Sequence, residues 1–203
     1  DLGKRSVNSA RIAWINATYL TEDTDAVAAK DGAELTELGV KYALAAAKYQ
    51  KASGLSAETK RKLDILRGGL VLPAPTRPGA ADELATIATK LQSDYGKGKG
   101  TLDGKSINGS DIEAAMGESR DPAKLKEMWT SWHDNVGAPM RPDYTKLVGL
   151  ANDGSKELGY ADAGAMWRSN YDMTPAQFEQ MMDKLWVDME PLYKSLHTYV
   201  RWK

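Results

Sequence analysis

Cysteine is absent from the chain, and histidine is scarce. The lack of cysteine excludes disulfides, thiolate zinc sites, iron–sulfur ligation and cysteine nucleophiles. The two histidines, His133 and His197, cannot form the zinc-protease motif, which needs two histidines four residues apart on one helix face with a glutamate between them. A zinc site built by these two histidines from distant helices is one hypothesis. The interpretation we prefer is that each histidine packs or forms hydrogen bonds near Trp132 or Tyr199.

Long apolar runs and a strong net charge are also missing. No stretch approaches the ~18–20 apolar residues that span a bilayer, and the first residues lack the apolar core of a signal peptide. The net charge of −1 gives no field that would favour nucleic acid or an anionic membrane. The chain is therefore expected to be cytoplasmic or a mature exported protein. Its 203 residues, 42% hydrophobic and 27% charged, indicate a globular protein of one domain or two small ones.

Apolar residues recur at helical spacing nearly throughout, which predicts an all-α fold. Helices are expected over about residues 7–19, 22–52, 57–71, 81–95, 111–118, 122–136, 143–158, 161–170 and 175–203. Their N-cap signals are Thr21, Ser56, Asp121-Pro122, Thr174-Pro175 and a capping box of Ser110 with Glu113. The buried face of the second helix is predicted to be Leu35, Leu38, Tyr42, Ala45, Ala46 and Tyr49. Pro191 should kink the last helix.

Three stretches interrupt the helical pattern. Residues 72–79 contain three prolines and cannot stay helical, so they are the best internal boundary. Residues 96–100 alternate glycine and lysine, but the spacing and the preceding strand of a phosphate-binding P-loop are missing, so a flexible exposed turn is expected. Residues 101–107 can form a short hairpin with Asp103-Gly104 as its turn.

Classical enzyme motifs are not found. Neighbouring acids such as Asp188 and Glu190 are expected to form solvated helix faces, although an independent hydrolase with two carboxyls facing across a groove stays open as an alternative. No G-x-S-x-G elbow occurs. Lysines are scattered and aromatic residues fall at core spacing, so nucleic-acid binding is unsupported.

Three segments are chemically unusual. Residues 128–133 hold two tryptophans three positions apart, residues 159–171 form a compact cluster of aromatic residues and arginine, and residues 190–201 lie near the end of the chain. On physical grounds alone, these segments predict helix crossings with Arg168 and Arg201 in ion pairs.

The same segments resemble one family of zinc peptidases. The stretch GYADAGAMWRSNYDM is similar to the Gly-Tyr/Phe-x-Asp-x-Gly-x-x-Trp-Arg-Ser-x-Tyr signature of the angiotensin-converting-enzyme family, and PLYKSLHTYVR resembles a helix of that family. MWTSWHDNVGAPMRPDYTKLVGLAN resembles the stretch before them. LPAPTRP and LATIATKLQSDYGKGK resemble the bacterial branch, and the lack of a cysteine pair near residues 97–107 agrees with it. Order and spacing agree over roughly residues 10–203.

The resemblance implies the N-terminal half of a two-lobed, mostly helical zincin-like peptidase with a deep groove. Residues 1–72 would be lid helices. Residues 73–110 would be a Pro/Gly-rich connection with one helix and a glycine-rich loop, and residues 111–203 would be groove-wall helices, truncated at the C-terminus. The implied activity is that of a peptidyl-dipeptidase, which releases C-terminal dipeptides from oligopeptide substrates.

The resemblance also implies zinc, held by the two histidines of an H-E-x-x-H motif and a downstream glutamate, with the motif's own glutamate as general base. None of these catalytic or metal-binding residues is in the chain, which is therefore expected to be inactive and to bind no zinc alone. Arg201 is similar to an arginine that helps to bind chloride in animal members, and is a candidate chloride ligand in the intact enzyme. A buried ion pair is an equal interpretation of Arg201. Trp202 departs from the family pattern.

The end of the sequence is still in helical register without a stop signal, so truncation by a cloning boundary, proteolysis or a short gene assignment is expected. The missing C-terminal half, or a second copy, would then cover the exposed groove face. The alternative function is a stand-alone helical binding or scaffold protein without catalysis. A reading frame that continues into H-E-x-x-H would favour the first hypothesis. A periplasmic or secreted location is what the family resemblance suggests.

Overall fold

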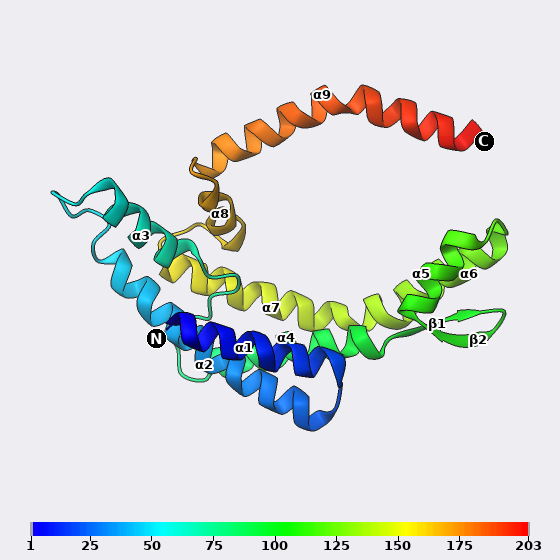
Figure 1. The fold of residues 1–203 in the computed structure, drawn as a ribbon, viewed down its shortest axis with the longest axis horizontal. Coiled ribbons are helices and arrows are strands. Elements are labelled where there is room, and N and C mark those ends of the chain that lie inside the picture. Colours follow the sequence, from blue (N-terminus) through cyan, green and yellow to red (C-terminus); the bar gives the residue numbers. More distant parts are fainter. Residues whose placement is uncertain (1, 203) are drawn as a thin grey trace.

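The computed structural model describes residues 2–202, which are almost entirely helical and include one two-stranded hairpin. The body consists of adjacent helices that lie along one another in Figure 1: α1 (Leu2–Thr18), α2 (Glu22–Ala47), α4 (Ala80–Lys97) and α7 (Ala138–Glu157). α9 (Pro175–Trp202) runs apart from this body and is joined to it through α8 (Ala163–Arg168) (Figure 1). The all-α expectation is confirmed. None of the helices in residues 2–202 is long and apolar enough to cross a membrane.

α2 packs through small side chains, and its predicted buried face was largely wrong. The residues of α2 that are buried are Asp31, Ala33, Gly39, Val40, Ala43 and Ala46. Of the predicted face only Ala46 is among them, whereas Tyr42 is 38% exposed and Tyr49 is 56% exposed. Small residues let α2 approach α4 closely, as at Gly32, where an added Cβ would lie 3.7 Å from the Cβ of Ala85. Bulky residues are therefore placed at the margins of this contact. The helix also ends at Ala47, earlier than expected.

α1 is attached to α2 mainly by polar side chains. The guanidinium of Arg5 lies 2.8 Å from a carboxylate oxygen of Asp31 and 2.5 Å from one of Glu34. At the other end of α1, the amide of Asn16 donates a 2.7 Å hydrogen bond to Asp25. Asn16 is also the one buried residue of α1 in the described chain. This helix therefore adds little to the apolar core.

The proline-rich segment packs tightly against the body. It follows α3 (Ala57–Gly68), which begins at the predicted cap Ser56. Pro73 is fully buried and Ala74 is 3% exposed. A Cβ added at Gly154 of α7 would lie 2.1 Å from the carbonyl oxygen of Pro73, so only glycine fits this close backbone approach. The segment is thus part of the packed structure and not a free linker.

The hairpin was predicted correctly, but the glycine-rich stretch before it was not. β1 (Lys99–Leu102) pairs antiparallel with β2 (Lys105–Asn108), and Asp103 and Gly104 between them have positive φ angles of 51° and 70°. Gly100 is buried in β1, where an added Cβ would lie 2.7 Å from Ile112 and 2.8 Å from the hydroxyl of Ser131. Residues 96–100 therefore end α4 and begin β1. They do not form a flexible exposed turn.

The cap of α5 (Gly109–Glu118) also differs from the expectation. Asn108, the last residue of β2, accepts a 2.9 Å hydrogen bond from the backbone N–H of Asp111. The helix therefore begins before Ser110, and the predicted capping box of Ser110 with Glu113 does not form. The next helix, α6 (Pro122–Trp132), begins as predicted at Asp121.

The predicted break after residue 136 is replaced by a continuous helical path. α6 leads through a π-helical turn at His133–Gly137 into α7, where the backbone N–H of Ala138 donates to the carbonyl of His133. Pro139 and Pro142 lie in the first turns of α7. A wider π turn is one way in which a helix passes proline rings that lack an N–H, which explains why the prolines do not end this helix.

Of the caps of the last two helices, the sequence analysis named only that of α9, at Thr174. Asp162 caps α8, which passes into a 3₁₀ turn at Ser169–Tyr171. Thr174 and Gln177 form reciprocal hydrogen bonds at the start of α9, with the Gln177 N–H donating to the Thr174 hydroxyl at 3.2 Å. α9 contains Pro191 and bends along its length in Figure 1, in agreement with the predicted kink.

Two apolar clusters stabilise the chain. The larger lies among α2, α4 and α7 and is formed by Ala33, Ala74, Ala81, Leu84, Ala85, Ile87, Leu91, Leu147 and Leu150. The smaller joins α2 to α8 through Ala43, Leu158 and Met166. Neither cluster includes a residue of α9.

Candidate functional site

The two histidines are placed by aromatic neighbours. The ring of His133 lies 4.1 Å from the ring of Trp129, and its Nδ1 is 2.7 Å from the carbonyl oxygen of that residue. On α9, His197 lies 4.3 Å from the ring of Tyr193. Each histidine thus has an aromatic contact, as expected, but with Trp129 and Tyr193 and on an exposed side of its helix. Within residues 2–202, no group of three or more histidine, aspartate or glutamate side chains could hold a metal ion.

The unusual segment at residues 159–171 forms the predicted helix crossing. Met166 is completely buried. The indole N–H of Trp167 donates a 2.7 Å hydrogen bond to the carbonyl of Val71, and the amide of Asn170 donates a 2.9 Å hydrogen bond to the carbonyl of Gly68. These contacts attach α8 to the end of α3 and to the proline-rich segment. They are structural contacts and bring no reactive groups together.

Arg168 and Arg201 do not form the ion pairs that the sequence suggested. Neither makes an ion pair with another of residues 2–202, and the Nε of Arg168 is buried without a hydrogen-bond partner. Arg201 is exposed near the end of α9. Within residues 2–202, α9 has no neighbour at this point that could bury Arg201, so the chloride ligand and the buried ion pair both stay predictions for the intact protein.

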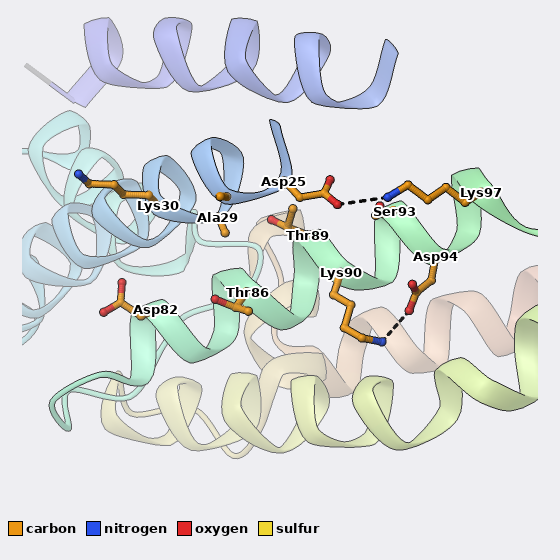
Figure 2. A pocket seen from close by; sticks show the side chains of 11 residues that line it. Asp25, Ala29, Lys30, Asp82, Thr86, Thr89, Lys90, Ser93, Asp94 and Lys97 are labelled. Atoms are coloured by element: carbon orange, nitrogen blue, oxygen red, sulfur yellow. Dashed lines mark hydrogen bonds and ion pairs between the residues drawn. The ribbon is translucent and has the colours of Figure 1, made fainter. Parts of the chain in front are cut away.

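A polar pocket lies between α2 and α4 (Figure 2). It measures about 500 Å³, and its lining includes three lysines and three aspartates: Asp25, Lys30, Asp82, Lys90, Asp94 and Lys97. Most of these charges neutralise one another. Lys97 lies 3.5 Å from Asp25, and Lys90 lies 2.7 Å from Asp94 and 2.8 Å from Asp143 of α7. The ion pairs of the pocket therefore connect α2 to α4, and α4 to α7.

Local contacts shift the pKa values of two of these groups. Hydrogen bonds to Asp143 and Asp94 raise the pKa of Lys90, which keeps it charged. Partial burial alone would raise the pKa of Asp25, but the hydrogen bond from Asn16, the neighbouring hydroxyl of Ser93 and the charge of Lys97 outweigh it, and the pKa falls below its ordinary value. Ser93 lies beside this pair in Figure 2 and is 3% exposed. With Lys90 protonated and Asp25 ionised, these two groups offer no activated nucleophile.

An unpartnered apolar surface lies on α9. None of the residues of this 28-residue helix is buried. Its large apolar side chains recur every three or four positions, so they share one side of the helix. We call this set the α9 apolar face: Met181, Met182, Leu185, Trp186, Met189, Leu192, Tyr193, Leu196 and Val200. Their exposed fractions lie between 39% and 65%. An exposed apolar surface of this extent marks an interaction site.

The segment that carries this face was recognised from its motif, and an exposed groove face on residues 111–203 was expected, but that face was not assigned to particular residues. The spacing of its apolar residues was the available signal, and the same spacing predicts a helix buried in a core. Only the structure distinguishes these cases, because the packing partner of a helix is not encoded in the helix itself.

The hairpin is held by α6 through a contact that the sequence analysis missed. The carboxylate of Glu127 accepts hydrogen bonds from the backbone N–H groups of Asp103 and Gly104, each 3.0 Å long. The N–H of Gly104 is the main cause that lowers the pKa of Glu127 below its ordinary value. Ser131 accepts a 2.8 Å hydrogen bond from the N–H of Thr101. A partner separated by more than twenty positions leaves no local signal in the sequence.

Comparison with known proteins finds one family over the whole length of the chain. A family model described as angiotensin-converting enzyme matches residues 1–203. The chain is 26% identical to an angiotensin-converting enzyme of Haematobia irritans exigua over all of this chain and 33% of the relative. It is 28% identical to angiotensin-converting enzyme-like protein Ace3 of Mus musculus over 93% of this chain and 25% of the relative. An 86-residue stretch is 46% identical to the enzyme of Mesocricetus auratus, covering 42% of this chain and 6% of the relative. The chain thus spans a third or less of these relatives.

Proposed function

Because the chain belongs to the angiotensin-converting enzyme family of peptidases, we propose that it is the N-terminal part of a zinc peptidyl-dipeptidase. In this proposal the intact protein releases dipeptides from the C-termini of oligopeptides. The match of the family model to residues 1–203, together with the 33% coverage of the fly relative, carries the proposal. These findings support a role for the chain as one part of a larger catalytic unit.

The residues present do not fit a zinc ion. Their carboxylates are already used in ion pairs or lie on exposed faces, and residues 2–202 contain no metal-ligating group of three side chains. We therefore assign no catalytic step to this chain. In the proposal, the H-E-x-x-H histidines, the third ligand and the general base come from other parts of the intact protein, and the chain alone is inactive.

The proposal also divides the chain into three parts, which share one apolar cluster. Residues 1–72 act as lid helices, residues 73–110 as the connection, and residues 111–203 as groove-wall helices. Support for the lid role comes from α1, which is held to α2 by the polar contacts of Arg5 and Asn16. A helix attached in this way can move at lower cost than one attached by a large apolar contact.

The α9 apolar face is the proposed contact with the catalytic half. Burying a large side chain such as Leu192, which is 63% exposed here, contributes roughly 1.5–3 kcal/mol in full. Several such side chains along one helix face would supply ample free energy for docking. Arg201 lies near the end of the same helix and has no ion-pair partner in residues 2–202. It is thus available as the proposed chloride ligand of the intact enzyme. Bacterial origin and a periplasmic or secreted location are further parts of this proposal.

The decisive experiment reads the gene beyond the codon of Lys203 and expresses the complete product. We expect an open reading frame that encodes H-E-x-x-H, and a product that contains stoichiometric zinc and releases a dipeptide from a chromogenic tripeptide. The 203-residue chain, expressed separately as the matched control, should neither retain zinc in elemental analysis nor cleave the tripeptide.

The alternative is a stand-alone helical binding or scaffold protein, in which a second copy covers the α9 apolar face. The exposure of that face is the observation that favours it. A stop codon directly after Lys203, combined with a stable dimer in sedimentation, would establish this alternative and end the peptidase proposal. Chelator-sensitive turnover by the 203-residue chain alone would contradict both.

A further inference from the structure

A second pocket, between the end of α2 and α3, combines positive charge with an incompletely paired arginine. It measures about 260 Å³. The polar side chains among its lining residues are Tyr49, Gln50, Lys51, Lys60, Asp64 and Arg67. Three of these are cations and one is an anion, so the pocket carries a net positive charge. The pocket between α2 and α4, in contrast, balances three lysines with three aspartates.

Arg67 is fixed in place, and one of its donors, the Nε–H, has no acceptor. Its guanidinium carbon lies 4.9 Å from the centre of the Tyr160 ring, and its side chain is only 15% exposed. The Nε atom is buried without a hydrogen-bond partner. Its one carboxylate neighbour, Asp64, is 3.8 Å away, which is too far for a hydrogen bond. A guanidinium that is already ordered pays little entropy to bind an oxyanion, and its planar donors match phosphate geometry.

The two lysines of the pocket are also uncommitted. Lys51 and Lys60 form no ion pair with any of residues 2–202, whereas Lys62 on the same helix is paired with Glu58 at 2.6 Å. The carbonyls at the end of α2 do not compete for them, since those of Ala46 and Ala47 accept backbone N–H groups of the following turn. The pocket therefore has one carboxylate, that of Asp64, against three cations, and Lys51 and Lys60 form no ion pair with it.

We propose that the α2–α3 pocket binds a small multivalent oxyanion of the phosphate class, held by Arg67, Lys51 and Lys60. The pocket is large enough for inorganic phosphate or a small phosphomonoester, whereas a larger polyanion could enter it only in part. Opposite charge favours the bound anion at the short distances that the pocket imposes. This site is separate from the proposed peptidase chemistry, because it needs neither zinc nor peptide.

The test is calorimetric titration of inorganic phosphate into the chain, with chloride adjusted to keep the ionic strength constant. We expect saturable binding of one phosphate per chain and a rise in the melting temperature with phosphate. The double variant Lys51→Gln/Lys60→Gln should bind at least about tenfold more weakly, because two charge contacts are lost. The matched control Lys105→Gln/Lys126→Gln removes two exposed lysines from β2 and α6 and should leave the affinity unchanged.

Arg67→Lys keeps the charge but removes the planar donors, and should also weaken binding. If that variant unfolds, the lysine double variant still decides the question. If Lys105→Gln/Lys126→Gln weakens phosphate binding as much as Lys51→Gln/Lys60→Gln does, net charge alone attracts the ion. If the heat of titration does not saturate as phosphate is added, no site exists. Either outcome overturns the proposal. A parallel titration with glycerol phosphate distinguishes the two sources of phosphate. If the natural ligand is a phosphomonoester, glycerol phosphate should bind at least as tightly as inorganic phosphate. If it is the free ion, only inorganic phosphate should bind.

Discussion

α4 and α9 are both amphipathic helices, but the chain treats them in opposite ways. α4 has 18 residues, of which seven are buried, and contributes Leu84, Ile87 and Leu91 to the main apolar cluster. α9 has 28 residues, none of them buried. α4 is therefore stabilised by packing within the chain. α9 presents an equally apolar side that its own chain leaves uncovered.

α9 is nevertheless helical, and local interactions explain this. Its first turn is closed by the reciprocal bonds of Thr174 and Gln177. Lys184 lies 2.6 Å from Asp188, and Lys194 lies 2.9 Å from Glu190, each pair four residues apart. Such pairs contribute about 0.3–0.5 kcal/mol each. Helix formation and tertiary burial are therefore separate properties. A long capped helix can be formed while its apolar side is still uncovered.

The strongest test of the comparison truncates one leucine in each helix. Leu84→Ala removes a side chain that is 3% exposed and should lower the free energy of unfolding by about 2–5 kcal/mol. Leu192→Ala on α9, where the leucine is 63% exposed, should change it by less than about 0.5 kcal/mol. Urea denaturation followed by circular dichroism measures both. A cost for Leu192→Ala as large as that for Leu84→Ala would show that α9 is packed in solution, as in a dimer.

A second test adds one methyl group within the body. Gly154→Ala places a Cβ 2.1 Å from the carbonyl oxygen of Pro73, so the backbone must shift, and a loss of about 1–3 kcal/mol is expected. Gly149→Ala on the same helix meets no atom within 4 Å and should stabilise α7 by about 0.5–1 kcal/mol. Thermal unfolding of the two variants gives shifts of opposite sign. Shifts of the same sign would mean that the proline-rich segment is not docked on α7.

A third test concerns α1, which is intermediate between the two extremes. Arg5→Gln leaves the carboxylate of Asp31, 8% exposed, without its cationic partner, and should cost about 1–2 kcal/mol. Arg11→Gln is the matched control, because Arg11 is exposed on the same helix and has no ion pair within residues 2–202. Hydrogen exchange should show faster exchange of the α1 amides in Arg5→Gln alone. Unchanged exchange would show that the ion pairs of Arg5 do not hold α1 on the body.

Much of the local structure follows from the sequence, because its causes are local. The caps at Thr21, Asp121 and Thr174 and the hairpin turn at Asp103 form as predicted. Two errors have local causes that were overlooked. Asn108, two residues before the predicted cap, is the cap of α5, and a π turn directly before the prolines after residue 137 accommodates them.

The candidate site shows a different limit. The family could be recognised from the motifs around Trp167 and Tyr193, since those motifs are contiguous. The buried side of α2 could not be predicted, because alanine and glycine at its contact with α4 are less hydrophobic than the leucines and tyrosines that the apolar pattern selects. The exposure of α9 and the pairing state of Arg67 depend on which elements meet in space, which no local pattern encodes.

The smallest expected effect concerns the hairpin, a polar attachment on the periphery of the body. The carboxylate of Glu127 accepts the N–H groups of Gly104 and Asp103, and these bonds hold its pKa below the ordinary value. A carboxyl whose pKa is lower in the folded state stabilises that state fully above the ordinary glutamate pKa, which is about 4.3. Its contribution is lost as the pH falls through the lower, folded pKa.

Exchange of the Gly104 amide should therefore show more opening as the pH falls from about 5 to about 3, after correction for the intrinsic rate. In Glu127→Gln the amide should open to the same extent at every pH in this range, because no carboxylate titrates there. The buried Met128 amide on the same helix is the internal reference and should stay protected in both proteins. The same acid dependence of Gly104 in Glu127→Gln would place the titrating group elsewhere, with Asp103 and its partner Lys124 at 2.9 Å as the next pair to examine.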